Sequence, residues 1–535
     1  MSYNSRRAPV YSTKGIVASS QPLASMAGIK ILQQGGNAAD AAVATAAALN
    51  ITEPCSTGLG GDCFALFYDG KRKKIYGING SGRAPAGLTV EKIHEQGITE
   101  KMPARSVHTV TVPGAAAGWV DTIERYGTLS MKEILQPAID LAKGYPVSPG
   151  TSGAWKRSAS LISRGPYGEE ILINGRGPNV GEIMRNPTLS DTFKSIAEHG
   201  KEGYYEGRIA EAIVDLIAPM GSYMTVDDLK KHESTFPEPI STDYHGVDVY
   251  EIPPNGQGIT ALLALNIAEE YDFTSMGHNS VKHLHTMIES IRLAFADTRW
   301  YVADPDIVDV PVEELISKKY AVERRKLINP ARATVDQVKG SPYASSDTVY
   351  FCTADGEGNA CSFINSNYAG FGTGLVPKGC GFTLQNRGAN FSVEPGHPNC
   401  VAPGKRPYHT IIPGMMMKDG ELYAPFGVMG GFNQPQGHMQ VVINMVDFGM
   451  NPQEALDAAR FSIGSGTAGG SVNLEEGITM DTMSSLSRMG HVVNPRTGSS
   501  RGAFGKGQII TRDPETGVLC GGSSPRADGM AIPLF

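Results

Sequence analysis

Hydrophobic positions recur every three to four residues through much of the first 300 residues, and they alternate with polar positions after about residue 340. The first pattern predicts amphipathic helices and the second predicts β-strands. Helices are expected up to Gln34, over Asn37–Leu49, and within 130–148, 207–222, 260–272, 280–305, 439–448 and 452–460. Strands are expected at 14–19, 62–69, 72–79, 348–354, 360–366, 380–384, 410–417, 421–427 and 508–513.

Helices that flank packed sheets predict an α/β layered sandwich. The helix over Asn37–Leu49 is so rich in alanine that we expect it to pack closely on a flat surface. A chain of 535 residues would ordinarily divide into domains, since single cores usually stop growing near ~250–300 residues. No glycine- or serine-rich linker divides this one, so we expect a single intertwined domain.

Composition and charge exclude several classes of protein. The chain is 41% hydrophobic and 19% charged, which is typical of a soluble globular protein. Its net charge of −7 argues against a nucleic-acid partner, and the basic run Lys71–Lys74 reads as a solvated turn. There is no apolar leader and no run of the ~18 apolar residues that a membrane span needs, so we expect no membrane partner and a cytoplasmic location.

Three sequence patterns resemble known functional motifs, but the segments around them do not fit those functions. Gly464–Gly469 matches G-x-G-x-x-G, but a helix precedes it and none follows. Gly498–Gly502 matches G-x-S-x-G, yet it leads into a strand-like run instead of the helix that a nucleophile elbow needs. His283 and His285 lie two apart and so point to different sides of a helix, and H-E-x-x-H does not occur. We therefore expect no metal and no organic cofactor.

Two glycine-rich turns and one hairpin remain as candidates for chemistry. The glycines of Glu53–Gly70 allow close approach of the backbone, although a tight helix-to-strand turn explains them equally well. The N–H groups of Gly430 and Gly431, near a predicted helix start, could hold an oxyanion. The polar run Ser345–Thr348 stands at the mouth of the predicted hairpin 348–366. It is either an ordinary start of a strand or a point where the chain is cut.

Several sequence blocks together resemble the γ-glutamyltransferase family of N-terminal-nucleophile hydrolases, from about residue 14 to residue 530. The blocks are Gly35–Ala44, Glu53–Gly61, Val112–Gly114, Tyr126–Leu129, Ala294–Arg299, Glu357–Ser362 and Phe371–Gly374. The resemblance implies a four-layer αββα sandwich of the N-terminal-nucleophile hydrolase type. "PPNGQG" at Pro253–Gly258 and "GSGRAP" also resemble the branch with oxamate-amidohydrolase-like and cephalosporin-acylase-like members.

Members of this family are proenzymes that cut themselves before a threonine, and the matching residue here is Thr348. The resemblance thus implies cleavage between Asp347 and Thr348, into a large subunit of residues 1–347 and a small subunit of residues 348–535. Cleavage would free an α-amine with an unperturbed pKa near ~7.7–8.0. Such an amine can act as general base for the hydroxyl of its own residue, which makes a weak nucleophile useful.

The resemblance also implies roles for four further residues. Gly430 and Gly431 match glycines whose N–H groups face the tetrahedral intermediate. Arg83 matches an arginine that grips the α-carboxylate of the substrate, for which the guanidinium fork is well shaped. Ser366 falls where the family commonly has a hydroxyl residue beside the nucleophile.

The substrate-binding positions depart from the family pattern. Asn390 replaces the acid that pairs with the substrate's α-ammonium, and Arg387 adds a positive charge. His409 and Thr410 replace a serine pair, and Tyr368 replaces an asparagine. A neutral amide can accept a hydrogen bond from an ammonium, but it loses the attraction between charges. The cleavage chemistry therefore carries over better than the γ-glutamyl specificity.

We expect a self-cleaving amidohydrolase that hydrolyses or transfers a γ-glutamyl group, as from glutathione, through an acyl-threonine intermediate. The alternative within this chemistry is another acyl amide, of the oxamate or cephalosporin type. The alternative of another class is a non-catalytic binding protein, against which the survival of Thr348, Gly430 and Gly431 speaks. The expected partners are a small-molecule amide and the chain's own two fragments, with homo-oligomers left open.

Overall fold

The alanine-rich segment after Asn37 forms helix α2 (Ala38–Thr52), in which every residue is buried. The side chain of Asn37 accepts the backbone N–H of Asp40, and the side chain of Asp40 accepts the backbone N–H of Asn37. This reciprocal pair caps the start of the helix. Oδ2 of Asp355 then accepts the N–H of Ala38 at 2.9 Å and ties the helix start to the sheet. The close packing expected from the composition of this helix is confirmed.

The computed structural model describes residues 7–334, 348–464 and 470–535, and these form two large antiparallel sheets. In spatial order, the seven-stranded sheet contains β1 (Val10–Ser12), β17 (Leu519–Ser523), β16 (Lys506–Arg512), β12 (Glu421–Met429), β11 (Gly414–Lys418), β8 (Val247–Glu251) and β7 (Ile240–Tyr244). The six-stranded sheet contains β18 (Met530–Pro533), β2 (Gly15–Ser19), β9 (Val349–Asp355), β10 (Ala360–Ser366), β3 (Asp62–Asp69) and β4 (Lys74–Gly80). Segments from before and after residue 347 contribute strands to both sheets.

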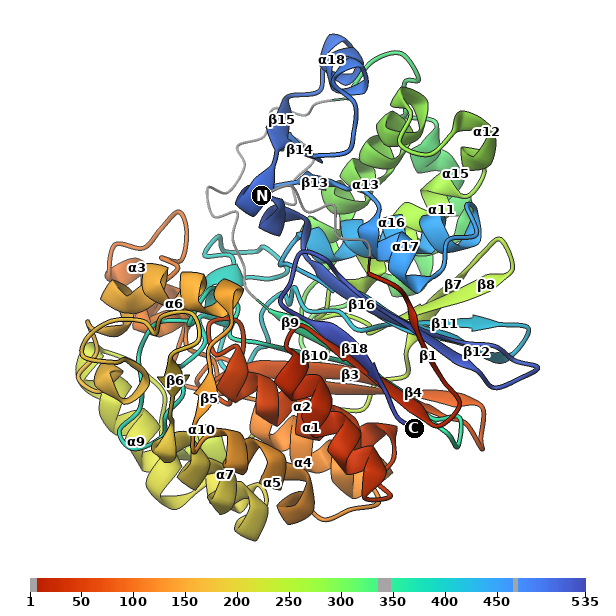
Figure 1. Cartoon of the computed structure of the whole chain (residues 1–535). Coiled ribbons are helices and arrows are strands. Elements are labelled where there is room, and N and C mark those ends of the chain that lie inside the picture. The colour runs from red at the N-terminus through yellow and green to blue at the C-terminus, as the bar shows by residue number, and fades with distance from the viewer. Residues whose placement is uncertain (1–6, 335–347, 465–469) are drawn as a thin grey trace.

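Helices cover the outer face of each sheet, which gives the four layers of an αββα sandwich (Figure 1). On the six-stranded sheet lie α1 (Pro22–Gln33), α2 and α4 (Ala115–Tyr126), with α5 (Met131–Leu141), α6 (Pro149–Ile162), α7 (Pro187–His199), α8 (Glu202–Tyr205) and α9 (Gly207–Ile217) further out. On the seven-stranded sheet lie α11 (Gly258–Ala268), α16 (Asn433–Val446) and α17 (Pro452–Asp457), with α13 (Val281–Tyr301), α15 (Lys318–Arg325) and α18 (Met480–Arg488) further out. The fold class expected from the sequence is confirmed.

Shorter elements decorate this frame. They are the helices α3 (Val90–Glu95), α10 (Val226–Lys230), α12 (Phe273–Met276) and α14 (Val312–Leu315), the small sheet of β13 (Phe461–Ile463), β14 (Val472–Glu475) and β15 (Val493–Arg496), and the pair β5 (Tyr145–Pro146) and β6 (Ile183–Met184). Within the ranges that the structure describes, every helix is too short or too polar to span a membrane.

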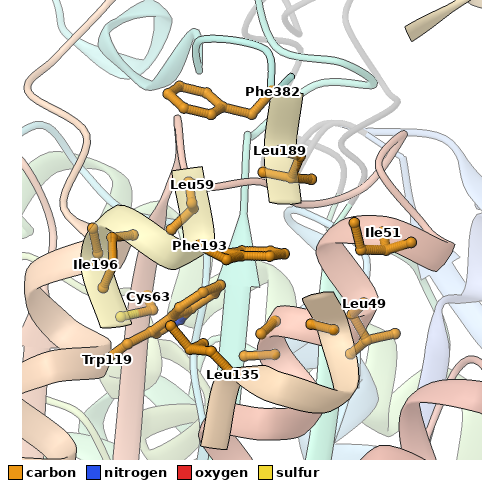
Figure 2. Packing of buried hydrophobic residues seen from close by; sticks show 14 of the residues in the cluster. Leu49, Ile51, Leu59, Cys63, Trp119, Leu135, Leu189, Phe193, Ile196 and Phe382 are labelled. Carbon is orange, nitrogen blue, oxygen red and sulfur yellow. The ribbon is translucent and has the colours of Figure 1, made fainter. Parts of the chain in front are cut away.

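The helical layer on the six-stranded sheet fixes the end of β10. Phe193 of α7 lies among Trp119 of α4, Leu135 of α5 and Leu49 of α2 in a core without solvent exposure (Figure 2). The indole N–H of Trp119 donates to Oδ1 of Asn365 at 3.0 Å, so this buried polar group is satisfied. Packing in the core thereby sets the position of the last residues of β10.

The two sheets are in close contact where β12 crosses β9. A Cβ at Gly427 would lie 2.5 Å from the ring of Tyr350, which is closer than carbon atoms approach one another. Met415, Ile510 and Met429 fill the same buried layer between the sheets. Glycine at this crossing therefore brings the end of β12 against the first residues of β9.

Several predicted elements differ from the structure in their limits or in kind. Residues 380–384 form an irregular loop, because Gly379 and Gly381 adopt positive φ and Leu384 bonds to Leu375 and Thr373 instead of a strand. The strand predicted at 410–417 begins only at Gly414, since Pro413 has no N–H and the N–H of Ile412 donates to Gln434. Helix α16 begins at Asn433, six residues before its predicted start.

Candidate active site

Thr348 immediately precedes β9 and has no solvent exposure. Its Oγ1 lies 3.0 Å from Oγ of Ser366, the last residue of β10, so the two hydroxyl groups form a hydrogen bond. The antiparallel register of β9 and β10, which pairs Val349 with Asn365, brings the two side chains together. The structure thus joins two of the predicted catalytic residues, whereas Asp347 lies outside the described residues.

Ser366 is held in turn by the loop that follows it. The N–H of Tyr368 donates to Oγ of Ser366 at 2.9 Å. Tyr368 has φ of +74°, which is rare for a large side chain and costs of order 1–3 kcal/mol. A Cβ at Gly61 would lie 2.3 Å from the carbonyl oxygen of Ser366, so only glycine fits there. The glycine-rich turn after Glu53 therefore packs directly against the backbone of Ser366, next to the hydrogen-bonded hydroxyl groups.

Arg387 lies in the same buried region, at the start of the 3₁₀ helix η4 (Arg387–Asn390). Its Nη1 donates to Oγ1 of Thr410 at 2.7 Å, and its Cζ lies 4.6 Å from the centre of the Tyr368 ring. Burial lowers the pKa of Arg387 to about 10, against the opposing effects of Asp62 and Tyr368. The guanidinium is therefore charged at neutral pH.

The side chain of His409 forms a hydrogen bond with Asp62. Its Nε2 lies 3.0 Å from Oδ2 of Asp62, and its Nδ1 accepts the N–H of Ile411 at 3.4 Å, so the proton sits on Nε2. Burial, followed by the charge of Arg387, lowers the pKa of His409 to about 3. Burial acts to raise the pKa of Asp62, but the hydrogen bond from His409 and the charge of Arg387 outweigh it and lower that pKa. The pair is a neutral imidazole beside a carboxylate.

Gln257 connects this region to the second glycine turn. Its Nε2 donates to the carbonyl oxygen of Thr410 at 2.6 Å and to that of Gly431 at 2.9 Å. Gly430 and Gly431 have φ of +138° and +57°, backbone conformations that favour glycine, between β12 and α16. A continuous series of contacts thus runs from Thr348 to Gly431. The oxyanion role of the two glycines stays a prediction.

Arg83 and Asn390 are held by other groups. Nη1 of Arg83 bonds to Asp304 at 3.0 Å, and its Nη2 bonds to Asp306 at 2.6 Å. Nδ2 of Asn390 donates to the carbonyl oxygen of Tyr408 at 3.0 Å, which fixes the orientation of the amide. Their roles as substrate ligands stay predictions.

Sequence reasoning missed Asp62, Gln257 and Gln385. Oδ1 of Asp62 accepts the N–H groups of Gly82 and Gly114 and a hydrogen bond from Gln385 at 2.9 Å, so both of its oxygens are used. An aspartate at the first position of a buried strand is rare unless it is paired, and that signal could have singled it out. Gln257 lies in the block Pro253–Gly258, whose resemblance to oxamate-amidohydrolase-like and cephalosporin-acylase-like members gave no role to this residue.

One group of described residues has the composition of a metal site. His285, Glu289 and His491 are buried, and their ligand atoms lie within 4.8 Å of one another. Nδ1 of His285 is 2.8 Å from Nε2 of His491, and Nε2 of His285 donates to the carbonyl oxygen of Asn329 at 2.8 Å. Three of the four imidazole nitrogens therefore have partners without an ion, and none of the three side chains contacts Thr348.

The family of the chain follows from its similarity to known proteins. The family model for gamma-glutamyltranspeptidase matches residues 24–534, and the chain belongs to that family. It is 38% identical over 528 residues to the glutathione hydrolase-like YwrD proenzyme of Bacillus subtilis, covering 98% of this chain and 99% of the relative. It is 30% identical to the oxamate amidohydrolase proenzyme of Klebsiella pneumoniae, over 97% of this chain and 98% of the relative. The crystal structure of cephalosporin acylase from Bacillus halodurans superposes with a TM-score of 0.92 at 46% identity, over 100% of this chain and 98% of that chain.

Proposed function

We propose that the chain cuts itself between Asp347 and Thr348 and then acts as an amidohydrolase through an acyl-Thr348 intermediate. The observation that carries this proposal is the pair of buried hydroxyl groups, Thr348 and Ser366, 3.0 Å apart at one end of the two central strands, β9 and β10, of the six-stranded sheet. Relatives named as proenzymes support the cleavage. The small fragment would then remain bound to the large one, because both contribute strands to each sheet.

In the cleavage step, Oγ1 of Thr348 attacks the carbonyl carbon of Asp347, and its proton passes to the nitrogen of Thr348. The C–N bond breaks and an ester forms, which water hydrolyses to a carboxylate on residue 347 and a free Thr348. This nitrogen takes the proton only as the tetrahedral intermediate breaks down; as the amide of the intact chain it cannot act as a base for the attack on a substrate. After cleavage it is an amine that can accept the proton of its own hydroxyl.

In catalysis, the Thr348 amine takes the hydroxyl proton as Oγ1 attacks the amide carbonyl of the substrate. The proton then passes to the leaving amine, which departs and leaves an acyl ester on Thr348. Water, or a second amine in transfer, attacks that ester and releases the acyl group. Gly430 and Gly431 would donate N–H bonds to the oxyanion, and one such donor is worth ~10²–10³ in rate.

The leading substrate class is a γ-glutamyl amide such as glutathione, as the family and the glutathione hydrolase-like relative suggest. A second candidate is an acyl amide without an α-ammonium group, as the names of the oxamate amidohydrolase and cephalosporin acylase relatives suggest. One observation favours it: Asn390 is a neutral amide already bonded to Tyr408, and Arg387 places a positive charge beside it in η4.

The test is a p-nitroaniline release assay combined with intact mass spectrometry of the rapidly quenched enzyme. We expect release from at least one acyl p-nitroanilide, and a mass increase of one acyl group on the fragment that begins at Thr348. A Thr348→Ala variant should show neither. Release without any acyl adduct, or with an adduct on another fragment, would contradict the mechanism.

A further inference from the structure

His285, Glu289 and His491 form a buried cluster that the proposed amide chemistry does not use. Their exposed fractions are 2%, 2% and 3%, and one ligand atom from each lies within 4.8 Å of the others. His285 and Glu289 are four positions apart on α13, so they project from the same face of that helix. His491 follows α18, which packs against α13. In the sequence His285 stands beside His283, and nothing there indicates a partner 206 positions away.

Hydrogen bonds to the backbone orient the two side chains of α13. Nε2 of His285 donates to the carbonyl oxygen of Asn329 at 2.8 Å, so its Nδ1 carries a lone pair, and this atom faces His491. Oε2 of Glu289 accepts the N–H of Thr334 at 2.8 Å, which leaves Oε1 for another partner. Side chains that ligate a metal are usually held in this way by a bond at their second polar atom. The two residues therefore have the arrangement of oriented metal ligands.

The atoms inside the cluster are incompletely satisfied. In the part of the chain that the structure describes, Oε1 of Glu289 and Nδ1 of His491 are buried without a hydrogen-bond partner. Nδ1 of His285 and Nε2 of His491 lie 2.8 Å apart, and because the first carries a lone pair, the second carries the proton. A buried carboxylate oxygen that accepts no hydrogen bond is costly. A cation bound between the three side chains would remove that cost.

The donor atoms fit one kind of ion. Two imidazole nitrogens and one carboxylate oxygen are a ligand set for Zn²⁺, with water as the fourth ligand. Zn–N bonds of ~2.0–2.1 Å in a tetrahedral site place the two nitrogens ~3.3 Å apart, so the rings need to separate by about 0.5 Å from 2.8 Å. The proton on Nε2 of His491 moves to Nδ1 of the same ring, which leaves a neutral imidazole with its lone pair toward the ion.

Arg292 is a positive charge beside this cluster. Its Nε lies 3.7 Å from Oε1 of Glu289, and its Nη2 donates to the carbonyl oxygen of Gly470 at 3.0 Å. A zinc ion bonded at ~2.0–2.2 Å attracts the carboxylate more strongly than this guanidinium does, because the ion is closer and carries twice the charge. The arginine nevertheless repels the ion, so its removal should tighten metal binding.

We propose that His285, Glu289 and His491 bind one Zn²⁺ ion, which joins α13 to the segment after α18 and stabilises the fold. After the cleavage proposed above, the ion links the large fragment, which supplies His285 and Glu289, to the small fragment, which supplies His491. The metal site itself does not depend on that cleavage. Thr348 bonds to Ser366 at the end of the six-stranded sheet, whereas α13 lies outside the seven-stranded sheet (Figure 1), so the ion acts on stability and not on the reacting groups.

Metal binding is measured on the purified chain after treatment with EDTA and removal of the chelator. Isothermal titration with ZnCl₂ should find one ion per chain, and titration with Co²⁺ should give the intense visible bands of tetrahedral coordination. In His491→Gln and in Glu289→Gln the affinity for Zn²⁺ should fall more than ~100-fold, since even the loss of a group that orients a ligand costs ~10–100-fold. The matched control is His283→Gln, at a buried histidine of the same helix, in which the affinity should be unchanged. Arg292→Gln should bind Zn²⁺ more tightly than the parent chain.

Two results would overturn the inference. They are the absence of stoichiometric zinc binding by the parent chain, and an affinity in His491→Gln equal to that of the parent. Should the variants fail to fold, the cobalt spectrum of the parent chain decides, because octahedral Co²⁺ held by scattered surface groups gives only weak bands.

Thermal unfolding separates a structural ion from a catalytic one. Zn²⁺ should raise the melting temperature of the parent chain, because an ion that binds only the folded protein stabilises it, and it should leave that of His491→Gln unchanged. The rate of p-nitroaniline release should be the same before and after the ion is removed. Loss of that rate in a protein that remains folded would overturn the structural role. An enzyme that hydrolyses no anilide would overturn the amidohydrolase proposal and leave the zinc site standing.

Discussion

The Nε2–H of His409 donates to Oδ2 of Asp62 at 3.0 Å, in a place where neither side chain reaches solvent. The pair joins residues 347 positions apart in the sequence. Asp62 also accepts three other hydrogen bonds, two of them from backbone N–H groups. The carboxylate of Asp62 thus connects His409, Gln385 and two backbone segments, while the imidazole stays neutral.

The first prediction concerns stability in acid. The pKa of His409 is lowered to about 3 in the folded protein, whereas an unfolded histidine has a pKa near ~6.5. Below pH ~6.5 the unfolded state therefore binds a proton at this histidine that the folded state does not bind. The contribution of His409 to the free energy of unfolding is complete above pH ~6.5 and decreases below it. Through His409, the free energy of unfolding should fall by about 1.4 kcal/mol for each pH unit below ~6.5. The lowered pKa of Asp62 acts in the same direction, because its stabilisation is lost as the pH falls through its folded value.

Denaturant unfolding of the uncut Thr348→Ala chain, at pH 7 and pH 5.5, measures this dependence. Adding His409→Gln, which keeps a donor for Asp62, should reduce the difference between the two pH values. The matched control is His199→Gln, at an exposed histidine of α7. An unchanged difference in His409→Gln would show that this residue does not cause the acid sensitivity.

The second prediction concerns the hydroxyl group beside the nucleophile. Ser366→Ala removes the hydrogen bond to Oγ1 of Thr348, and such a bond is worth about 1 kcal/mol, so cleavage and kcat should each slow by several-fold to tenfold. The control is Ser362→Ala on the same strand, whose hydroxyl bonds to the buried Tyr350 at 2.8 Å instead. Time courses of fragment appearance on gels, and kcat, give the comparison. Equal slowing in both variants would mean that the effect is on packing rather than on Thr348.

The third prediction concerns the pH dependence of the rate. The proposed base is the α-amine of Thr348, so kcat/KM should rise with pH with an apparent pKa near ~8 or somewhat below, because the charge of Arg387 favours the neutral amine. His409 should add no step between pH 6 and 7, since its pKa is about 3. A profile of kcat/KM from pH 5.5 to 9.5 checks this. A step near pH 6.5 that disappears in His409→Gln would make the histidine the base.

Much of the frame could be predicted from the sequence, because the signals for it are local. An apolar run after a glycine-rich turn gave strand 62–69 with the observed limits, and the alanine content of the segment after Asn37 indicated close packing on a flat surface. Residues 380–384 misled the same reasoning, since glycines with positive φ turn an apolar run into a loop. A local pattern cannot reveal where the hydrogen bonds of such a run go.

The site was predicted less completely, because its contacts join distant segments. Thr348 and Ser366 could be placed together, since a hairpin fixes their relation. The acids around Arg83 lie more than 200 positions away from it, and nothing in the sequence near Arg83 indicates them. The cluster of His285, Glu289 and His491 could be recognised only once segments 206 positions apart had been placed beside each other.

The central claim, that a threonine gains a free amino group and then acts as nucleophile, has one direct test. Intact mass and N-terminal sequencing of the purified protein should find two fragments, the shorter beginning with Thr348, while Thr348→Ala remains a single chain of 535 residues. Thr348→Ser should still be cut, since it keeps the hydroxyl. An active preparation that remains uncut, or whose shorter fragment begins at another residue, would contradict the account.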